Sequence, residues 1–227
     1  LLVGGEKMSK SKLTGIAPND ITDTFGSDAF RHYFMSAITF GQDGSFSWED
    51  LSARYQAELA NGFGNLASRA LAMVGKYFEG VVPAPADYAP ADKAIIDVVA
   101  AATANADAAI ERVAINEAIA EIWAIVDALN GYITEMEPWV LAKDDANRDR
   151  LGTVLYVVVE GLRALAVLLA PVMSIATGKL WNALGVEATL GALAVQPIRD
   201  AGRWGQTPAG TVIAALEPLF PRIETAE

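Results

Sequence analysis

Two lysines and two serines near the start of the chain form the segment whose residue types best suit chemistry. The segment reads Lys7-Met8-Ser9-Lys10-Ser11 and comes shortly after Gly4-Gly5. Its ammonium groups would neutralise a polyphosphate as pyrophosphate leaves, and its hydroxyls and backbone N–H groups would donate hydrogen bonds. In isolation, however, these five residues would be interpreted as a solvated Lys/Ser loop.

A second set of residues could contact a nucleobase. Asn65 and Arg69 are spaced i and i+4, so on a helix they share one face and present several donors and one acceptor. Pro138 would begin a helix and leave Trp139 in its exposed first turn, where an indole can stack on a splayed-out base. The alternative is that Trp139 is a core anchor and that Asn65 and Arg69 form a solvated pair.

The other polar and aromatic candidates are interpreted as structural. His32 lies in an aromatic-rich helical segment, and the acids near it are favoured at helix starts by the helix dipole rather than as metal ligands. With no Cys and one His in the chain, a disulfide scaffold, a thiolate zinc site and a cysteine nucleophile are excluded, and no metal site is predicted. The acids are Asp20, Asp23 and Asp28, and the tryptophans assigned to packing are Trp48, Trp123 and Trp181.

Composition predicts a folded protein of 227 residues, because 52% of them are hydrophobic and only 20% are charged. The net charge of −11 argues against loose, charge-driven binding to nucleic acid, but it leaves room for a local, shape-specific site. Mean hydropathy is +0.27. The most apolar stretch, residues 154–181, is interrupted by charges and by Pro171, so it predicts a buried core helix rather than a membrane span.

No signal peptide is recognised, and the chain begins on an apolar stub without an initiator Met. We therefore expect a cytoplasmic protein without a membrane partner, and a piece of a longer one.

The elements that would position these residues are mainly helical. Residues 1–3 are expected to be extended, and residues 6–17 to form a polar loop. Asn19 is expected to cap a short helix that ends at Gly26, Ser27 to cap a second one, and residues 41–46 to turn into a short strand.

From Ser47 onward the sequence predicts a series of helices. Ser47 and Asp50 have the spacing of a capping box. One six-residue apolar stripe, spaced 4, 3, 4, 3, 4, predicts a core-facing helix: Ile115, Ile119, Ile122, Val126, Leu129 and Ile133. The predicted helices span about 48–78, 91–104, 107–133, a short one from 138, 145–169 and 171–185.

The segment of residues 7–11 resembles the KMSKS signature of class I aminoacyl-tRNA synthetases, which follows a strand and precedes two short helices. Three later segments resemble the methionyl-tRNA synthetase family in particular. They are Glu58-Leu59-Ala60-Asn61 with Asn65-Leu66-Ala67-Ser68-Arg69, then Asn130 through Glu137-Pro138-Trp139 to Ala142-Lys143, and Pro218 to Glu224. Leu13 departs from the family, which usually has Gly there.

The resemblance implies a mainly α fold in which a small α/β stem-contact element precedes an antiparallel anticodon-binding helix bundle. It divides the chain into residues 1–48 (loop and stem-contact element), 49–185 (bundle) and 186–227 (C-terminal return segment). It implies that residues 7–11 bind ATP, with Mg as the counter-ion of ATP, and that Lys7 and Lys10 are catalytic. It also implies that Asn65, Arg69 and Trp139 bind the CAU anticodon.

The implied activity is attachment of methionine to its tRNA through methionyl-adenylate. The implied partners are methionine tRNA, the substrates methionine and ATP, and an upstream catalytic part of the same protein, without which this chain is predicted inactive. A monomer is expected. The competing hypothesis is a non-catalytic acidic helical module that docks tRNA or protein.

Overall fold

The computed structural model describes residues 2–3, 6–7 and 16–223, and within them three short strands form one sheet. The strands are β1 (Leu2–Val3), β2 (Glu6–Lys7) and β3 (Ser45–Phe46), in the order β2-β1-β3. β1 is antiparallel to β2 and parallel to β3, with Leu2 opposite both Lys7 and Ser45. The prediction of a loop from residue 6 onward was wrong at Glu6 and Lys7, because both residues pair with β1.

Two short helices, α1 (Pro18–Phe25) and α2 (Ser27–Ala37), follow the sheet. Asn19 does not cap α1, because the helix begins at Pro18, whose missing N–H costs nothing there. The cap position is Ala17, whose N–H donates a hydrogen bond to the Asp20 carboxylate at 3.3 Å. Gly26, at φ 82°, separates the two helices, so Ser27 is the first residue of α2 and not its cap. A small core joins these helices to β3 and the next helix: Ile21, Tyr33, Phe46 and Leu51.

The predicted long helix after Ser47 is confirmed, but its middle has another geometry. Its three continuous parts are α3 (Trp48–Arg54), the π-helix η1 (Tyr55–Gly64) and α4 (Asn65–Phe78). Ser47 Oγ accepts a hydrogen bond from the N–H of Asp50 at 3.0 Å, which confirms the predicted cap. The π-helix was not predicted from the sequence.

The bundle continues with α5 (Pro90–Glu111) and α6 (Ile115–Met136), which pack against each other. The predicted break at about residues 104–107 was wrong, because α5 runs to Glu111 and the turn is made by residues 112–114. The predicted stripe faces the core: five of its residues are buried and Ile115 is half-buried.

The helix α8 (Arg148–Leu169) lies at the centre of the bundle, in contact with α4, α5, α6 and α9 (Ser174–Leu184). Together with η2 (Asp145–Asn147) it is the one described helix long and apolar enough to cross a membrane, and its most apolar window is completely buried. This confirms the prediction of a core helix. α9 begins at Ser174 rather than at Pro171, since residues 170–173 form a turn.

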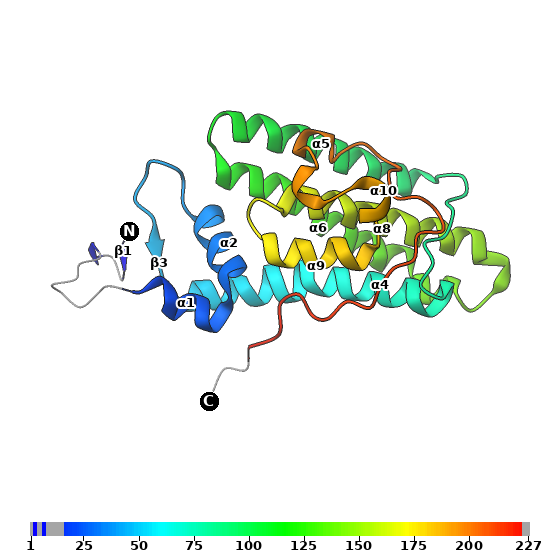
Figure 1. Cartoon of the computed structure of the whole chain (residues 1–227), viewed down its shortest axis with the longest axis horizontal. Helices are drawn as coiled ribbons and strands as arrows, with labels where there is room; N and C mark the ends of the chain where they lie inside the picture. Colours follow the sequence, from blue (N-terminus) through cyan, green and yellow to red (C-terminus); the bar gives the residue numbers. More distant parts are fainter. Residues whose placement is uncertain (1, 4–5, 8–15, 224–227) are drawn as a thin grey trace.

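The remaining elements are α7 (Pro138–Leu141), between α6 and α8, and short helices after α9: α10 (Glu187–Leu190), η3 (Leu193–Val195) and η4 (Ile198–Asp200). Figure 1 shows the sheet with α1 and α2 at one end of the molecule and the bundle beyond them. The mainly α fold class is confirmed.

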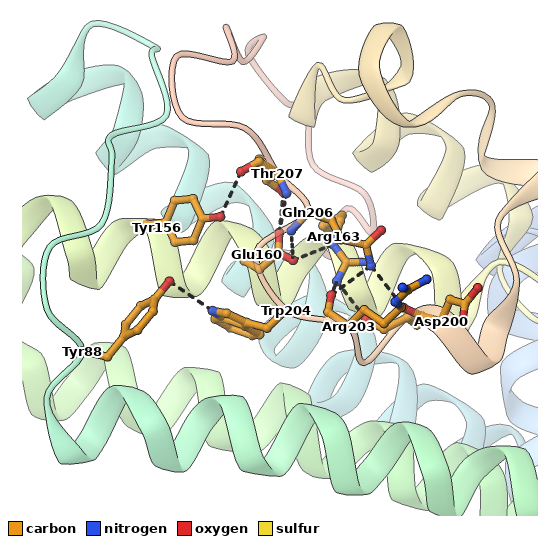
Figure 2. A network of polar contacts seen from close by, with 10 residues as sticks. Tyr88, Tyr156, Glu160, Arg163, Asp200, Arg203, Trp204, Gln206 and Thr207 are labelled. Atoms are coloured by element: carbon orange, nitrogen blue, oxygen red, sulfur yellow. Dashed lines mark hydrogen bonds and ion pairs between the residues drawn. The ribbon is translucent and has the colours of Figure 1, made fainter.

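The segment after α9 is held on the bundle by a buried charge pair (Figure 2). Glu160 and Arg163, both on α8, have exposed fractions of 0% and 2% and lie 3.0 Å apart. Glu160 accepts hydrogen bonds from the backbone N–H groups of Gln206 and Thr207, and Arg163 donates to the carbonyl of Ala201. The segment then runs back to η1, where Tyr55 donates to the carbonyl of Pro221 at 2.7 Å.

Candidate functional site

Asn65 and Arg69 lie in the first turns of α4, directly after the π-helix. Their neighbours Leu66, Ala67 and Ala70 are buried in the core, which turns the face carrying Asn65 and Arg69 outward. Asn65 is exposed and Arg69 half-buried. Within the described part of the chain neither side chain has a hydrogen-bond or ion-pair partner, so both keep their donors and acceptors available for a ligand.

Trp139 is presented by a sharp turn at the end of α6. Glu137 adopts the left-handed conformation, at φ 43°, and Pro138 then begins α7. Pro138 is buried, whereas Trp139 has an exposed fraction of 39%. The predicted placement of an exposed Trp139 in the first turn of a short helix is therefore confirmed. Its role remains a prediction.

The packing of α6 on the long helix brings these residues to the same end of the bundle. Glu58 and Trp123 both contact His32, and further along Asn130 donates to the carbonyl of Gly62 at 3.4 Å. The two helices therefore run in the same direction. Each residue advances a helix by about 1.5 Å. Seven residues beyond the contact of Asn130 with Gly62, the long helix reaches Arg69 and α6 reaches its end, so these two positions lie level with each other along the bundle.

The C-terminal return segment adds a wall beside Asn65. Residues 218–222 and the η1–α4 junction line a cavity of about 390 Å³, with Asn61, Asn65 and Ser68 on one side. Arg222 donates to Asn61 Oδ1 at 3.5 Å, so a second guanidinium lies near Asn65. Arg222 was not predicted to belong to this site. The sequence signal for Arg222 was the resemblance of residues 218–224 to the family, but that resemblance did not indicate where these residues pack.

Most of the predicted ATP-binding residues lie outside the part of the chain that the structure describes. The backbone of Lys7 lies in β2, while Met8, Ser9, Lys10 and Ser11 lie outside the described residues. Their assignment remains a prediction based on sequence. The elements described on either side of them, β2 and then α1 and α2, are those that the resemblance implied.

The structural candidates occupy structural positions, with some differences. His32 is buried, lies 2.7 Å from Glu58 Oε2 and contacts Trp123, with the two rings tilted by 37°. Asp28 lies in the first turn of α2, but its carboxylate accepts a hydrogen bond at 2.7 Å from the N–H of Ala176 in the first turn of α9, so it caps another helix. No group of three His, Cys, Asp or Glu residues that could hold a metal occurs within the described ranges.

The three tryptophans assigned to packing differ in exposure. Trp181 is buried and Trp123 is half-buried. Trp48 packs on Phe25 and Phe46, yet 40% of its surface is exposed.

The fold and the family models together define a class: a helical bundle of an anticodon-binding family that follows a segment of a class I tRNA synthetase. Residues 1–71 match the family model described as tRNA synthetases class I (M), and residues 82–227 match the one described as the anticodon binding domain of methionyl tRNA ligase. The second match covers more than half of the chain. The chain therefore belongs to the methionyl-tRNA synthetase family.

Relatives and solved structures agree with this assignment. The chain is 55% identical to a methionine–tRNA ligase of Streptomyces coelicolor and 38% identical to one of Caldanaerobacter subterraneus. Each comparison covers 99% of this chain. It resembles Mycobacterium tuberculosis methionyl-tRNA synthetase bound by methionyl-adenylate, with a TM-score of 0.84 and 33% identity over 95% of the chain and 42% of that structure. The chain spans 42% and 34% of the lengths of the two relatives.

Proposed function

We propose that this chain supplies anticodon recognition and the KMSKS loop to an enzyme that attaches methionine to its tRNA. The observation that carries the proposal is the presence of three unpartnered side chains, Asn65, Arg69 and Trp139, at one end of a bundle that belongs to an anticodon-binding family. The competing hypothesis, a non-catalytic tRNA-docking or protein-interaction module, would use the same bundle without the loop chemistry.

The three residues would divide anticodon recognition between them. The Asn65 amide and the Arg69 guanidinium would pair with base edges, and their shared helix face fixes the geometry of these hydrogen bonds. Trp139 would stack on a splayed-out base, an interaction worth about 1–3 kcal/mol. Recognition of this kind needs no basic surface, which is consistent with the net charge of −11.

The loop of residues 7–11 would act in the first chemical step. The methionine carboxylate attacks the α-phosphorus of ATP, methionyl-adenylate forms and pyrophosphate leaves. Lys10, assisted by Lys7, would stabilise the departing pyrophosphate, while Met8, Ser9 and Ser11 would complete the ATP contacts. A hydroxyl of the terminal adenosine of the tRNA then attacks the methionyl carbonyl, and AMP leaves. ATP would enter with Mg as its counter-ion.

The proposal assigns residues 1–48 to the loop and stem-contact element, 49–185 to the anticodon-binding bundle and 186–227 to the return segment. An upstream catalytic part of the same protein would supply the methionine pocket, so this chain alone is expected to be inactive. We further propose a monomer in the cytoplasm without a membrane partner.

One experiment tests both halves of the proposal in the full-length synthetase. Trp139→Ala should weaken binding of a hairpin with a CAU anticodon by about 10-fold or more, because a stacked base is lost, while ATP–pyrophosphate exchange persists. Lys10→Ala should do the reverse: exchange collapses and hairpin binding remains. Binding is followed by fluorescence at one fixed, moderate salt concentration, with a hairpin changed in one anticodon base alongside.

The matched control is Trp48→Ala, since Trp48 has nearly the same exposed fraction as Trp139 (40% against 39%). It should leave the preference for the CAU hairpin unchanged. The anticodon role would be refuted if Trp139→Ala bound the CAU hairpin as tightly as wild type does and if neither protein distinguished the CAU hairpin from the changed one. Normal exchange by Lys10→Ala would instead favour the docking module.

A further inference from the structure

The segment that carries Trp139 is closed at its neck by one side chain. Residues 137–147 leave α6 after Met136 and re-enter the bundle at the start of α8. Arg150, in the first turn of α8, donates from Nη2 to Met136 Sδ at 3.1 Å. Because Met136 is the last residue of α6, this contact joins the two ends of the segment directly.

The same guanidinium is held in place by a buried carboxylate. Asp92, in the first turn of α5, has an exposed fraction of 0%. Arg150 Nη1 and Nη2 lie 2.5 and 2.8 Å from its two oxygens, a two-pronged contact that fixes the orientation of the guanidinium. The Tyr132 hydroxyl, one turn before the end of α6, donates to Asp92 Oδ1 at 2.5 Å. The cluster therefore ties α5, the end of α6 and the start of α8 together.

The turn beyond this cluster needs such support. Glu137 is a non-glycine residue at φ 43°, a conformation that persists only where its surroundings hold it. The residues that follow are exposed at Trp139 and Val140, so the outer side of the turn contributes little restraint. On its inner side, α7 is held by the buried Pro138, by Leu141 and Ala142 packed on the core, and by contact with α8. Arg150 adds a polar link between the start of α8 and the last turn of α6, from which α7 leaves.

We propose that Arg150 is a positioning residue for anticodon recognition. By bridging Asp92 and Met136 it closes the neck of residues 137–147 and holds Trp139 in the orientation that stacks on a base. This inference rests on the proposed function of Trp139. Arg150 itself does not touch the RNA.

The test is a double-mutant cycle in the full-length synthetase, with the dissociation constant of the CAU hairpin as the readout. Arg150→Lys keeps a cation beside Asp92 but cannot bridge to Met136 as well, and we expect it to raise the dissociation constant by about 3-fold. Arg150→Met should raise it by about 10-fold. In a Trp139→Ala background the same substitutions should have almost no effect, because the group that Arg150 positions is gone. Thermal melting of each variant shows whether it is folded.

The matched control is Arg112→Met. Arg112 pairs with Glu117 at 2.9 Å where α5 meets the other end of α6, far from Trp139 in the chain. It should leave the dissociation constant unchanged in both backgrounds. Equal effects of Arg150→Lys with and without Trp139 would overturn the positioning role while leaving the proposed function intact. An unchanged dissociation constant for Trp139→Ala itself would overturn the proposed function, and this inference with it.

Discussion

Asp92 shows how one buried carboxylate is kept charged in this protein. Burial by itself would raise its pKa, but the hydrogen bonds from Arg150, Tyr132 and the N–H of Ala89 outweigh burial and hold the pKa below its ordinary value. Burial, followed by the hydrogen bond to Asp92 and the charge of Asp92, raises the pKa of the Tyr132 hydroxyl against the opposing effect of Arg150, so Tyr132 stays a neutral donor. The cluster is therefore stable as one carboxylate, one guanidinium and one phenol.

This charge state makes a stability prediction with a definite dependence on pH. A carboxyl group with a lowered pKa stabilises the folded state above its unfolded pKa, about 3.9, and loses that contribution as the pH falls through the folded pKa. Asp92→Asn should therefore lower the free energy of unfolding by about 2 kcal/mol at pH 7. The difference from wild type should shrink below about pH 4. Urea unfolding at a series of pH values measures both quantities.

The neighbouring Asp97 provides the control, because it lies on the same helix but is exposed. Asp97→Asn should change the free energy of unfolding little at any pH. A difference between wild type and Asp92→Asn that stayed constant down to pH 3 would mean that the ionised form of Asp92 is not the stabilising one.

At the scale of elements, periodicity predicted the helices well and their ends less well. The stripe from Ile119 to Ile133 correctly identified the buried face of α6. The turn between α5 and α6 was misplaced because residues 104–114 contain neither Gly nor Pro, and Val113, a β-branched residue, adopts the left-handed conformation at φ 60°. Local sequence carries no signal for such a turn, which is held by the packing of the two helices.

The candidate site was also predictable in part, because residue spacing and helix-start signals indicate local structure but not how distant segments pack. The i, i+4 spacing placed Asn65 and Arg69 on one face, and Pro138 indicated where the helix bearing Trp139 begins. The meeting of these elements depends on contacts between residues far apart in sequence, such as Asn130 with Gly62 and Arg150 with Met136. No spacing rule predicts contacts of that kind.

A close contact between α6 and α8 at Gly161 gives a prediction at this scale. A Cβ atom on Gly161 would lie 2.7 and 2.9 Å from the two Cδ atoms of Leu129, which is completely buried. Gly161→Ala should therefore lower the free energy of unfolding by about 1–3 kcal/mol through overpacking. Chemical denaturation measures this value.

Gly75 in α4 is the matched control, because nothing lies within 4 Å of a Cβ built there. Gly75→Ala should raise the free energy of unfolding by up to about 1 kcal/mol, since alanine favours a helix over glycine. If both substitutions stabilised the protein, Leu129 would have room to move, and the two helices would not be in close contact at Gly161.

At the scale of the whole molecule, the return segment connects the far side of the bundle with the η1–α4 junction beside Asn65. It is held in two different ways. The backbone pairs with other segments at Ile213, whose N–H donates to the carbonyl of Gly80, and at Ala214, whose N–H donates to that of Ala183. The backbone pairing extends back to Gly210, whose N–H donates to the carbonyl of Val82. Before Gly210 the segment is held through side chains, which include Glu160 and Arg163 (Figure 2).

This division predicts that loss of the buried charge pair loosens only part of the return segment. Glu160→Gln leaves the Arg163 guanidinium buried without a counter-ion and should lower the free energy of unfolding by about 3 kcal/mol. Hydrogen exchange should accelerate at the amides of Gln206 and Thr207, which donate to the carboxylate, but not at Ile213 and Ala214. Glu217→Gln, at an exposed position of the same segment, should change neither rate. Faster exchange at all four amides would instead mean that the segment opens as one unit, so that Glu160 would hold the wall beside Asn65 in place as well.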